Sequence, residues 1–179
     1  QRILKKIIFD KKILSIIRDP IIDYKKINFL KRKKIENKFL QKKYFVSIGR
    51  LTYQKNFLFL AQCLKKILKK EKNFIFLIIG EGQDRKKIEG YIERFRLSNY
   101  IILTGYKKNI FKYVSNSEGL ICSSLWEEPG FIIQEAAACK KIILTSDCYT
   151  GPSEFLNHGK NGYVFKTNDK KSFIKNFEK

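Results

Sequence analysis

Short apolar runs alternate with amphipathic segments along most of this chain. Residues 44–49 read YFVSIG and residues 74–80 read FIFLIIG, and runs of this length and composition are typical of strands buried on both faces of a parallel sheet. The segments that separate such runs place apolar residues at helical spacing. The alternation therefore predicts a doubly wound, Rossmann-like parallel α/β sheet.

The strands and helices of this sheet can be placed by residue range. Strands are predicted at residues 44–49, 74–80, 101–104, 119–122, 141–145 and 163–165. Helices are predicted after Asn56, which is expected to cap the first of them, around residues 88–95, and from about residues 110, 131 and 151.

The first part of the chain has a different character. Residues 1–43 are predicted to be largely irregular, with a short strand at residues 13–17, a break at Asp19–Pro20 and a lysine-rich stretch after it. The chain contains no methionine, which indicates a portion of a longer protein. We therefore expect residues 1–43 to be an interdomain linker at the end of an N-terminal domain that lies outside this chain, and residues 44–179 to form one domain.

Candidate binding groups follow the first three predicted strands. In doubly wound sheets, ligands bind outside the carboxyl ends of the strands, so the loops there carry the chemistry. Arg50 and Lys55 place two cations before a helix, which suits a diphosphate, although two solvated basic residues would look the same. The turn at residues 80–82, Gly-Glu-Gly, lets a ligand or another backbone segment approach. The candidate residues of these loops are Gly49, Arg50, Lys55, Tyr106 and Lys107.

The loop after the fourth strand holds a pair of carboxylates. It reads SSLWEEPGFIIQEAAA over residues 123–138, with seven residues between Glu127 and Glu135. Pro129 and Gly130 predict a turn, and Phe131 begins an apolar helix. Glu127 is thus expected on a loop and Glu135 on the helix, where they could hold a ligand or act as the acid and base of glycoside cleavage.

The charge of the chain is strongly positive, with a formal net charge of +21. Residues 1–44 carry 15 Lys and Arg against 4 Asp and Glu, and the remainder carries 23 against 13, so the first quarter holds half of the net charge. No zinc-finger, helix-turn-helix or single-strand-binding signature accompanies it, so we expect no nucleic-acid partner. Attraction to an anionic membrane surface and a lysine-rich background composition both remain open.

Cysteine and histidine offer no further chemistry. The four cysteines have no C-x-x-C spacing and lie in apolar runs, which predicts buried free thiols in a reducing cytoplasm. His158 is the only histidine, and its neighbourhood predicts a polar loop residue rather than a catalytic base.

The motifs taken together resemble one enzyme family. GRLTYQKNF, LIIGEG, ILTGY, the E-x7-E pair followed by two alanines, TSDCYTGPSEFL and GKNGYVF occur in this order over about residues 42–167. In order and spacing they are similar to the C-terminal donor-binding domain of GT-B glycosyltransferases of the family-4, or group 1, type. The resemblance implies that the chain is the C-terminal half of a GT-B architecture, with a nucleotide-sugar-binding domain at residues 44–179.

The resemblance also implies a role for each candidate residue. Arg50 and Lys55 would hold the donor diphosphate and neutralise the leaving group. Glu135 would accept hydrogen bonds from the ribose, and Glu127 would contact the transferred sugar. The roles at the diphosphate and at the transferred sugar make Glu127, Arg50 and Lys55 the expected catalytic residues. The other expected donor-binding groups are Gly49, Tyr106, Lys107 and the backbone N–H groups of Gly130, Phe131 and Ile132.

One departure from the family pattern concerns the sugar-facing carboxylate. Many members have Glu-Gly-Phe-Gly or Glu-Gly-Phe-Pro where this chain reads Glu127-Glu128-Pro129-Gly130-Phe131. The seven-residue gap favours Glu127 and Glu135 as the pair, while Glu128 competes for the sugar-facing role.

The activity that the resemblance implies is transfer of a sugar with retention of configuration. The donor would be a nucleoside-diphosphate sugar and the acceptor a glycan or lipid-linked molecule, in the synthesis of cell-surface polysaccharide or lipopolysaccharide. The chain has no D-x-D motif, so no metal and no cofactor are expected. The expected location is the cytoplasm, with peripheral contact at the inner membrane face.

Two other functions remain compatible with the residues. The Glu pair would serve a glycoside-cleaving enzyme, in which Arg50 and Lys55 would have no purpose. A non-catalytic basic module that binds nucleic acid or membrane would make the carboxylates incidental.

Overall fold

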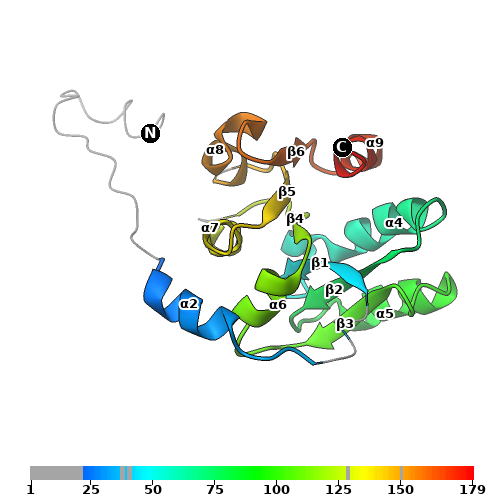
Figure 1. Cartoon of the computed structure of the whole chain (residues 1–179). Coiled ribbons are helices and arrows are strands. Elements are labelled where there is room, and N and C mark those ends of the chain that lie inside the picture. Colours follow the sequence, from blue (N-terminus) through cyan, green and yellow to red (C-terminus); the bar gives the residue numbers. More distant parts are fainter. Residues whose placement is uncertain (1–21, 37–38, 40–41, 128–129, 150) are drawn as a thin grey trace, which may run out of the picture.

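The sheet is the centre of the fold. The computed structural model describes residues 22–36, 39, 42–127, 130–149 and 151–179. Six parallel strands form one sheet in the order β3-β2-β1-β4-β5-β6 (Figure 1). The strands are β1 (Lys43–Ile48), β2 (Phe74–Ile79), β3 (Ile101–Gly105), β4 (Gly119–Cys122), β5 (Ile142–Ser146) and β6 (Tyr163–Phe165). The chain order reverses between β1 and β4, which is where doubly wound sheets bind ligands.

Helices cover both faces of the sheet. One face carries α4 (Phe57–Ile67), α5 (Arg85–Arg94) and α9 (Lys170–Phe177) (Figure 1). The other face carries α2 (Tyr24–Lys31), α6 (Phe111–Asn116) and α7 (Phe131–Ala138), with α8 (Pro152–Phe155) near the end of β5. Short 3-10 helices, η2 (Tyr53–Lys55) and η3 (Asn157–Gly159), complete the described elements.

Alternating residues of each strand pack into two separate apolar cores. Leu77 of β2 packs in the core beneath α6 and α7, whereas its neighbour Ile78 packs beneath α4 and α5. Leu120 and Ile121 of β4 divide in the same way. Because successive side chains of a strand point to opposite faces, a strand covered on both sides must be apolar at every position. This explains the continuous apolar runs of the sequence.

The predicted fold class and strands are confirmed. The predictions for residues 119–122 and 163–165 coincide with β4 and β6, those for β2 and β3 differ by one residue at one end, and those for β1 and β5 differ by one residue at both ends. The predicted cap was wrong. Asn56 occupies the N-cap position of α4 in a left-handed conformation without a capping bond, and its side-chain amide donates to Asn168 instead, at 2.8 Å.

Two helices were not predicted. α9 begins after Asp169, whose carboxylate accepts from the backbone N–H groups of Lys171 and Ser172, and it buries Phe173 completely. Helix α2 lies within the segment expected to be irregular. Asp23 caps it by accepting from Lys26 N, and Ile27 anchors it in the core.

The segment after α2 also packs on the domain, since Ile35 and Phe39 are buried beside Tyr113. The predicted strand at residues 13–17 lies outside the described residues, and the domain boundary at residues 43 and 44 stays a prediction. Across the described residues, no helix combines the length and apolar character needed to cross a membrane.

Candidate functional site

The loops after β1 and β2 are joined directly through their backbones. Gly49 N donates to Ile79 O at 3.0 Å. A Cβ on Gly80 would lie 1.9 Å from the carbonyl oxygen of Gly49, and a Cβ on Gly82 would lie 2.4 Å from that of Leu51. These contacts are closer than any side chain permits. The Gly-Glu-Gly turn therefore serves the approach of one backbone to another.

A cavity of about 410 Å³ opens at the ends of β1, β2 and β3. Arg50 and Tyr106 are exposed at it, the ring of Tyr106 by 74%. It is lined by Ile48, Gly49, Arg50, Ile79, Gly80, Glu81, Tyr106, Lys107 and Ile110. The structure thus brings together four residues predicted separately from the first and third loops: Gly49, Arg50, Tyr106 and Lys107.

Lys107 is held at this cavity by a residue that precedes β1. Its Nζ lies 3.4 Å from Oε1 of Glu36, a carboxylate that also accepts from the hydroxyl of Tyr113 at 2.6 Å and from Lys112 at 3.3 Å. Burial alone would raise the pKa of Glu36, but the hydrogen bonds from Tyr113 and Lys112 outweigh it and lower the pKa to about 2. Glu36 was missed in the sequence because nothing local distinguishes it from other linker residues.

Glu127 forms a buried ion pair with Lys55. Only 4% of Glu127 is exposed, and its Oε1 lies 2.5 Å from Lys55 Nζ. The same oxygen accepts from the hydroxyl of Ser124, three residues earlier. The backbone carbonyl of Ser124 accepts in turn from the hydroxyl of Ser146 at the end of β5, at 2.6 Å. The two residues predicted to face the donor thus contact each other directly.

Contacts between the first and fourth loops bring this pair together. The hydroxyl of Ser123 donates to Lys55 O at 2.8 Å, and the side-chain amide of Gln54 donates to Trp126 O at 3.0 Å. Gly49 clears the path of the lysine side chain, because a Cβ there would lie 3.0 Å from Lys55 Cε. Gly49 also lines the cavity, so the stem of Lys55 lies against a residue of the cavity wall, although Lys55 and Glu127 themselves are not among the lining residues. Ser123 and Gln54 were not among the predicted site residues.

Glu135 has a different environment. It is half-buried on α7, and no described residue forms a hydrogen bond or ion pair with its side chain. Burial raises the pKa of its carboxyl group. Gly130 begins the helix with a φ of 75°, a left-handed conformation that favours glycine.

The first N–H groups of α7 have no acceptor within the helix, as at any helix N-terminus. They include those of Phe131 and Ile132, and the ring of Phe131 is 45% exposed beside them. Glu128, the competitor for the sugar-facing role, lies outside the described residues. The ligand-binding roles of all these side chains stay predictions.

The four cysteines lie in the interior of the domain. All four cysteines are free and buried, and burial raises the pKa of the Cys122 thiol, which lies near Glu127.

Among the described residues, no three His, Cys, Asp or Glu side chains gather in a way that could hold a metal ion. The expectation of a metal-independent reaction remains a prediction.

Comparisons with known proteins point to one family. The model of the family described as "Glycosyl transferases group 1" matches residues 28–179. An uncharacterized glycosyltransferase of Methanocaldococcus jannaschii is 34% identical over 135 residues, covering 70% of this chain and 33% of that protein. The poly(ribitol-phosphate) alpha-N-acetylglucosaminyltransferase of Staphylococcus aureus is 28% identical over 142 residues, covering 79% and 29%. The chain spans about a third of the length of these relatives.

Solved structures of other proteins share the fold of this chain. The crystal structure of TarM superposes with a TM-score of 0.71 at 27% identity, covering 75% of this chain and 27% of that one. The C-terminal domain of a group 1 glycosyl transferase from Francisella tularensis has the same TM-score at 20% identity and covers 85% of both chains, which shows the shared fold. This chain has the fold of a C-terminal GT-B domain and belongs to the glycosyl transferases group 1 family.

Proposed function

We propose that this chain is the donor-binding half of a retaining glycosyltransferase that uses a nucleoside-diphosphate sugar. The observation that carries the proposal is the Lys55–Glu127 pair, held at 2.5 Å, in which the stem of Lys55 packs against Gly49, and Gly49 lines the same cavity as Arg50. A cation and a carboxylate fixed at the point where the strand order reverses suit a ligand that has both phosphates and sugar hydroxyls.

Arg50 and Lys55 would bind the diphosphate. An ammonium group has three donors, so Lys55 can keep its bond to Glu127 and still donate to phosphate oxygens. As the glycosidic C–O bond breaks, negative charge develops on the leaving diphosphate, and the two cations would stabilise it. Loss of one such group is expected to lower the rate on the order of 100-fold.

The two glutamates would bind different parts of the donor. Glu127, oriented by Lys55 and Ser124, would accept from hydroxyls of the transferred sugar. Glu135 would accept from the ribose hydroxyls, which are donors that its half-buried carboxylate lacks among the described residues. The N–H groups at the start of α7 would face the phosphates and the sugar.

The acceptor would be a glycan or lipid-linked molecule of cell-surface polysaccharide or lipopolysaccharide synthesis. The names of two relatives support this: the Staphylococcus aureus enzyme acts on poly(ribitol-phosphate), and a galactosyltransferase of Escherichia coli, 29% identical, acts on a diphosphoundecaprenol-linked sugar. An N-terminal domain outside this chain would complete the acceptor site. We place the whole enzyme in the cytoplasm, at the inner membrane face.

The only tryptophan of the chain reports on this site. Trp126 precedes Glu127 and is 44% exposed. Titration with UDP, GDP, uridine and guanosine is expected to change its emission saturably for one diphosphate, with calorimetry as a second readout. Absence of binding to every nucleoside diphosphate by a folded sample would contradict the proposal. Release of sugar from simple aryl glycosides, without such binding, would favour the glycoside-cleaving alternative.

Two variants separate the proposed roles. Lys55→Ala is expected to weaken diphosphate binding far more than nucleoside binding, whereas Glu135→Ala is expected to weaken binding of the nucleoside itself. Equal losses for Lys55→Ala would remove Lys55 from the phosphates, and unchanged nucleoside binding would remove Glu135 from the ribose. The chain alone is expected to bind donor without transferring sugar.

A further inference from the structure

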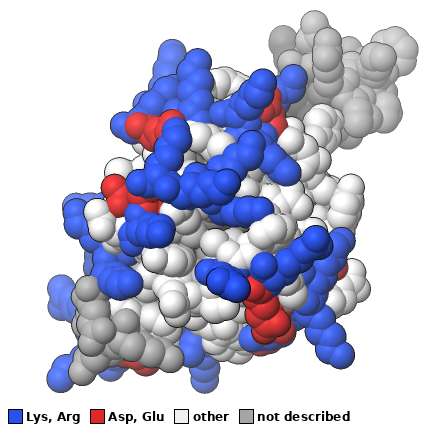
Figure 2. Space-filling view, turned by 90° about the vertical axis from the view of Figure 1, so that its right-hand side faces the viewer, with Lys and Arg blue, Asp and Glu red and all other residues white. Residues whose placement is uncertain are grey.

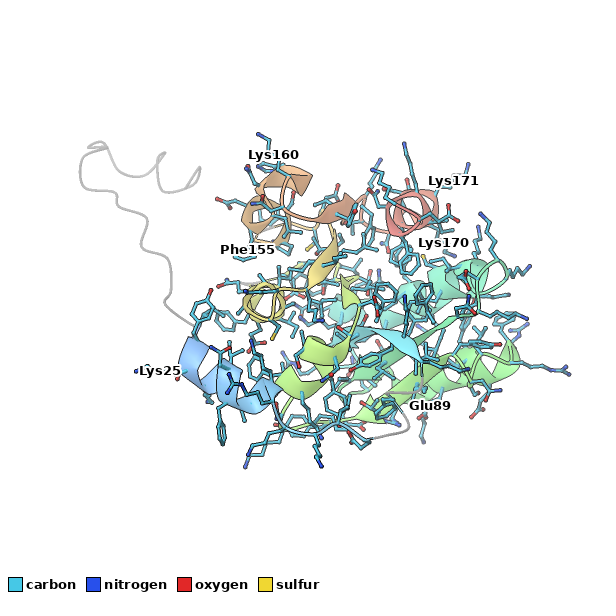
Figure 3. The ribbon with its side chains drawn as sticks, viewed as in Figure 1. Lys25, Glu89, Phe155, Lys160, Lys170 and Lys171 are labelled. Carbon is cyan, nitrogen blue, oxygen red and sulfur yellow. The ribbon has the colours of Figure 1, made fainter. Side chains whose placement is uncertain are left out.

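One face of α2 carries exposed rings among cations. Residues at spacings of three, four, seven and eight share one face of a helix, and they line a surface groove of about 500 Å³ here. The residues of this surface, called the α2 outward face below, are Lys25, Asn28 and Phe29 of α2 together with Arg32 and Lys33, which directly follow its last residue. Ile27 points the other way, into the core beside α6. Figure 3 shows Lys25 directed away from the body of the domain.

Two aromatic rings on this helix remain in contact with solvent. Phe29 and Tyr24 are each 62% exposed. Lys33 Nζ lies 4.3 Å from the centroid of the Phe29 ring, so a cation flanks the ring directly. Single exposed apolar side chains are common on protein surfaces, so the feature that sets Phe29 apart is the cations that border it.

The charge between the two flanking acids, Asp23 and Glu36, is positive throughout. Between residues 24 and 35 there is no Asp or Glu, and the cations are Lys25, Lys26, Lys31, Arg32, Lys33 and Lys34. The acids on either side are engaged elsewhere, because Asp23 caps the helix and Glu36 binds Tyr113, Lys107 and Lys112. Among the described residues, no carboxylate forms an ion pair with these six cations.

A second basic surface of the domain shows why the rings matter. The side that carries α4, α5 and α9 is also rich in Lys and Arg (Figure 2). There, however, acids neutralise part of the charge: Lys70 pairs with Glu178, and Arg85 pairs with Glu81 and Glu89. None of the exposed large apolar side chains of the described residues lies on α4, α5 or α9. Of these two basic surfaces, the α2 side is the one on which cations without an ion-pair partner among the described residues lie beside an exposed ring.

We propose that the α2 outward face binds an anionic lipid surface. Phe29 would enter the headgroup region, and Lys25, Arg32 and Lys33 would contact lipid phosphates. A single helix with one ring bordered by cations suffices for a flat lipid surface, whereas single-stranded nucleic acid calls for a basic groove with successive stacking platforms. This contact is separate from donor binding and would bring the domain to lipid-linked substrates.

Each basic residue near an anionic surface contributes about a fivefold factor to partitioning, so three of them contribute about 100-fold. Binding is therefore expected to weaken as salt rises. Loss of the Phe29 ring is expected to weaken binding independently of salt, because the ring contributes by apolar burial.

The test is co-sedimentation of the chain with vesicles of phosphatidylcholine alone or mixed with phosphatidylglycerol. The wild type is expected to bind the mixed vesicles only. The variant Lys25→Gln/Arg32→Gln/Lys33→Gln is expected to lose about 100-fold. The matched control Lys86→Gln/Lys87→Gln/Arg94→Gln removes the same charge from exposed positions of α5 and is expected to bind nearly as well as the wild type.

A second pair of variants tests the ring. Phe29→Ala is expected to weaken vesicle binding, and Phe155→Ala, a ring 42% exposed on α8, is expected to leave it unchanged. Equal losses for the two charge variants, or no effect of Phe29→Ala, would overturn the proposal. Tighter α2-dependent binding to single-stranded RNA, or an α2-dependent dimer without vesicles, would also overturn it. Diphosphate binding reported by Trp126 should persist in every α2 variant, so a failure here is distinct from failure of the proposed function.

Discussion

The carboxyl edge of the sheet has two halves that are joined in different ways. At β1 and β2, the loops meet backbone to backbone, with Gly80 against Gly49 and Gly82 against Leu51. From β1 across to β4, the loops meet largely through side chains, including the ion pair between Lys55 and Glu127. The first kind of contact requires the absence of a Cβ, and the second requires charge.

This difference between backbone and side-chain contacts indicates which part of the edge can respond to a ligand. A backbone contact without side chains offers nothing to rearrange or titrate, so it fixes the shape of the cavity. An ion pair can exchange or share its partners with phosphate and sugar groups. The glycine motifs of the sequence are therefore structural, and the charged residues carry the proposed chemistry.

The largest effect on stability is expected from disrupting the backbone contact between the loops after β1 and β2. Gly80→Ala would place a Cβ 1.9 Å from the carbonyl oxygen of Gly49, so the loops must separate, at a cost of about 3 kcal/mol or more. Gly90→Ala is the control, because nothing lies within 4 Å of its Cβ in α5, and a gain of up to about 1 kcal/mol is expected. Urea unfolding measures both. Similar stabilities would contradict the close approach.

The next largest effect on stability is expected from disrupting the ion pair between the loops after β1 and β4. Lys55→Ala leaves Glu127, with a side chain 5% exposed, without its ammonium partner and is expected to lower the free energy of unfolding by about 2 kcal/mol. Lys107→Ala removes a lysine whose partner Glu36 is 38% exposed, so the loss should stay below about 1 kcal/mol. In the double variant Lys55→Ala/Glu127→Gln, part of the loss should be recovered, because no buried carboxylate remains. Additive losses would show that the pair is not coupled.

A smaller effect concerns the turn between the two glutamates. Gly130→Ala introduces a side chain at a φ of 75° and is expected to cost about 1 kcal/mol through backbone strain, since the nearest atom to the new Cβ is 3.6 Å away. Gly130→Asn should cost less, because asparagine tolerates the left-handed region better. Thermal unfolding of the two variants provides the comparison, and a larger loss for Asn would point to crowding in place of strain.

The smallest effect is a difference in pH dependence between two glutamates. Burial raises the pKa of Glu135 in the folded state, so the stability that this group contributes is present below its unfolded pKa and is lost as pH rises through the folded pKa. Glu135→Gln should therefore be more stable than the wild type at neutral pH, by less than about 1 kcal/mol, and this advantage should shrink in acid.

Glu36 is the opposite case. Its folded pKa of about 2 lies below the ordinary value of 4.5, so its contribution is present above 4.5 and is lost as pH falls toward 2. Glu36→Gln should be destabilised at neutral pH and should approach the wild type in acid. Urea unfolding of both variants across this range would show opposite slopes, and parallel curves would contradict the assigned environments.

Local signals determined most of what could be predicted. The apolar runs of β1 and β2 mark buried strands without reference to the rest of the chain. The cap of α9 at Asp169 and the apolar residues Phe173 and Phe177 were equally local but were overlooked. The cap at Asn56 was mispredicted because its amide finds Asn168, a partner 112 positions away that competes with the helix end.

The sequence by itself determined the strands, the parallel α/β class and the loops that carry the charged residues, because a strand buried on both faces leaves a pattern within a few residues. Only the tertiary structure decided that Lys55 meets Glu127, 72 positions later, and that Glu36 holds Lys107. Such contacts depend on which strands become neighbours and on how deeply each side chain is buried. No local pattern encodes them, since they arise from packing the whole sheet.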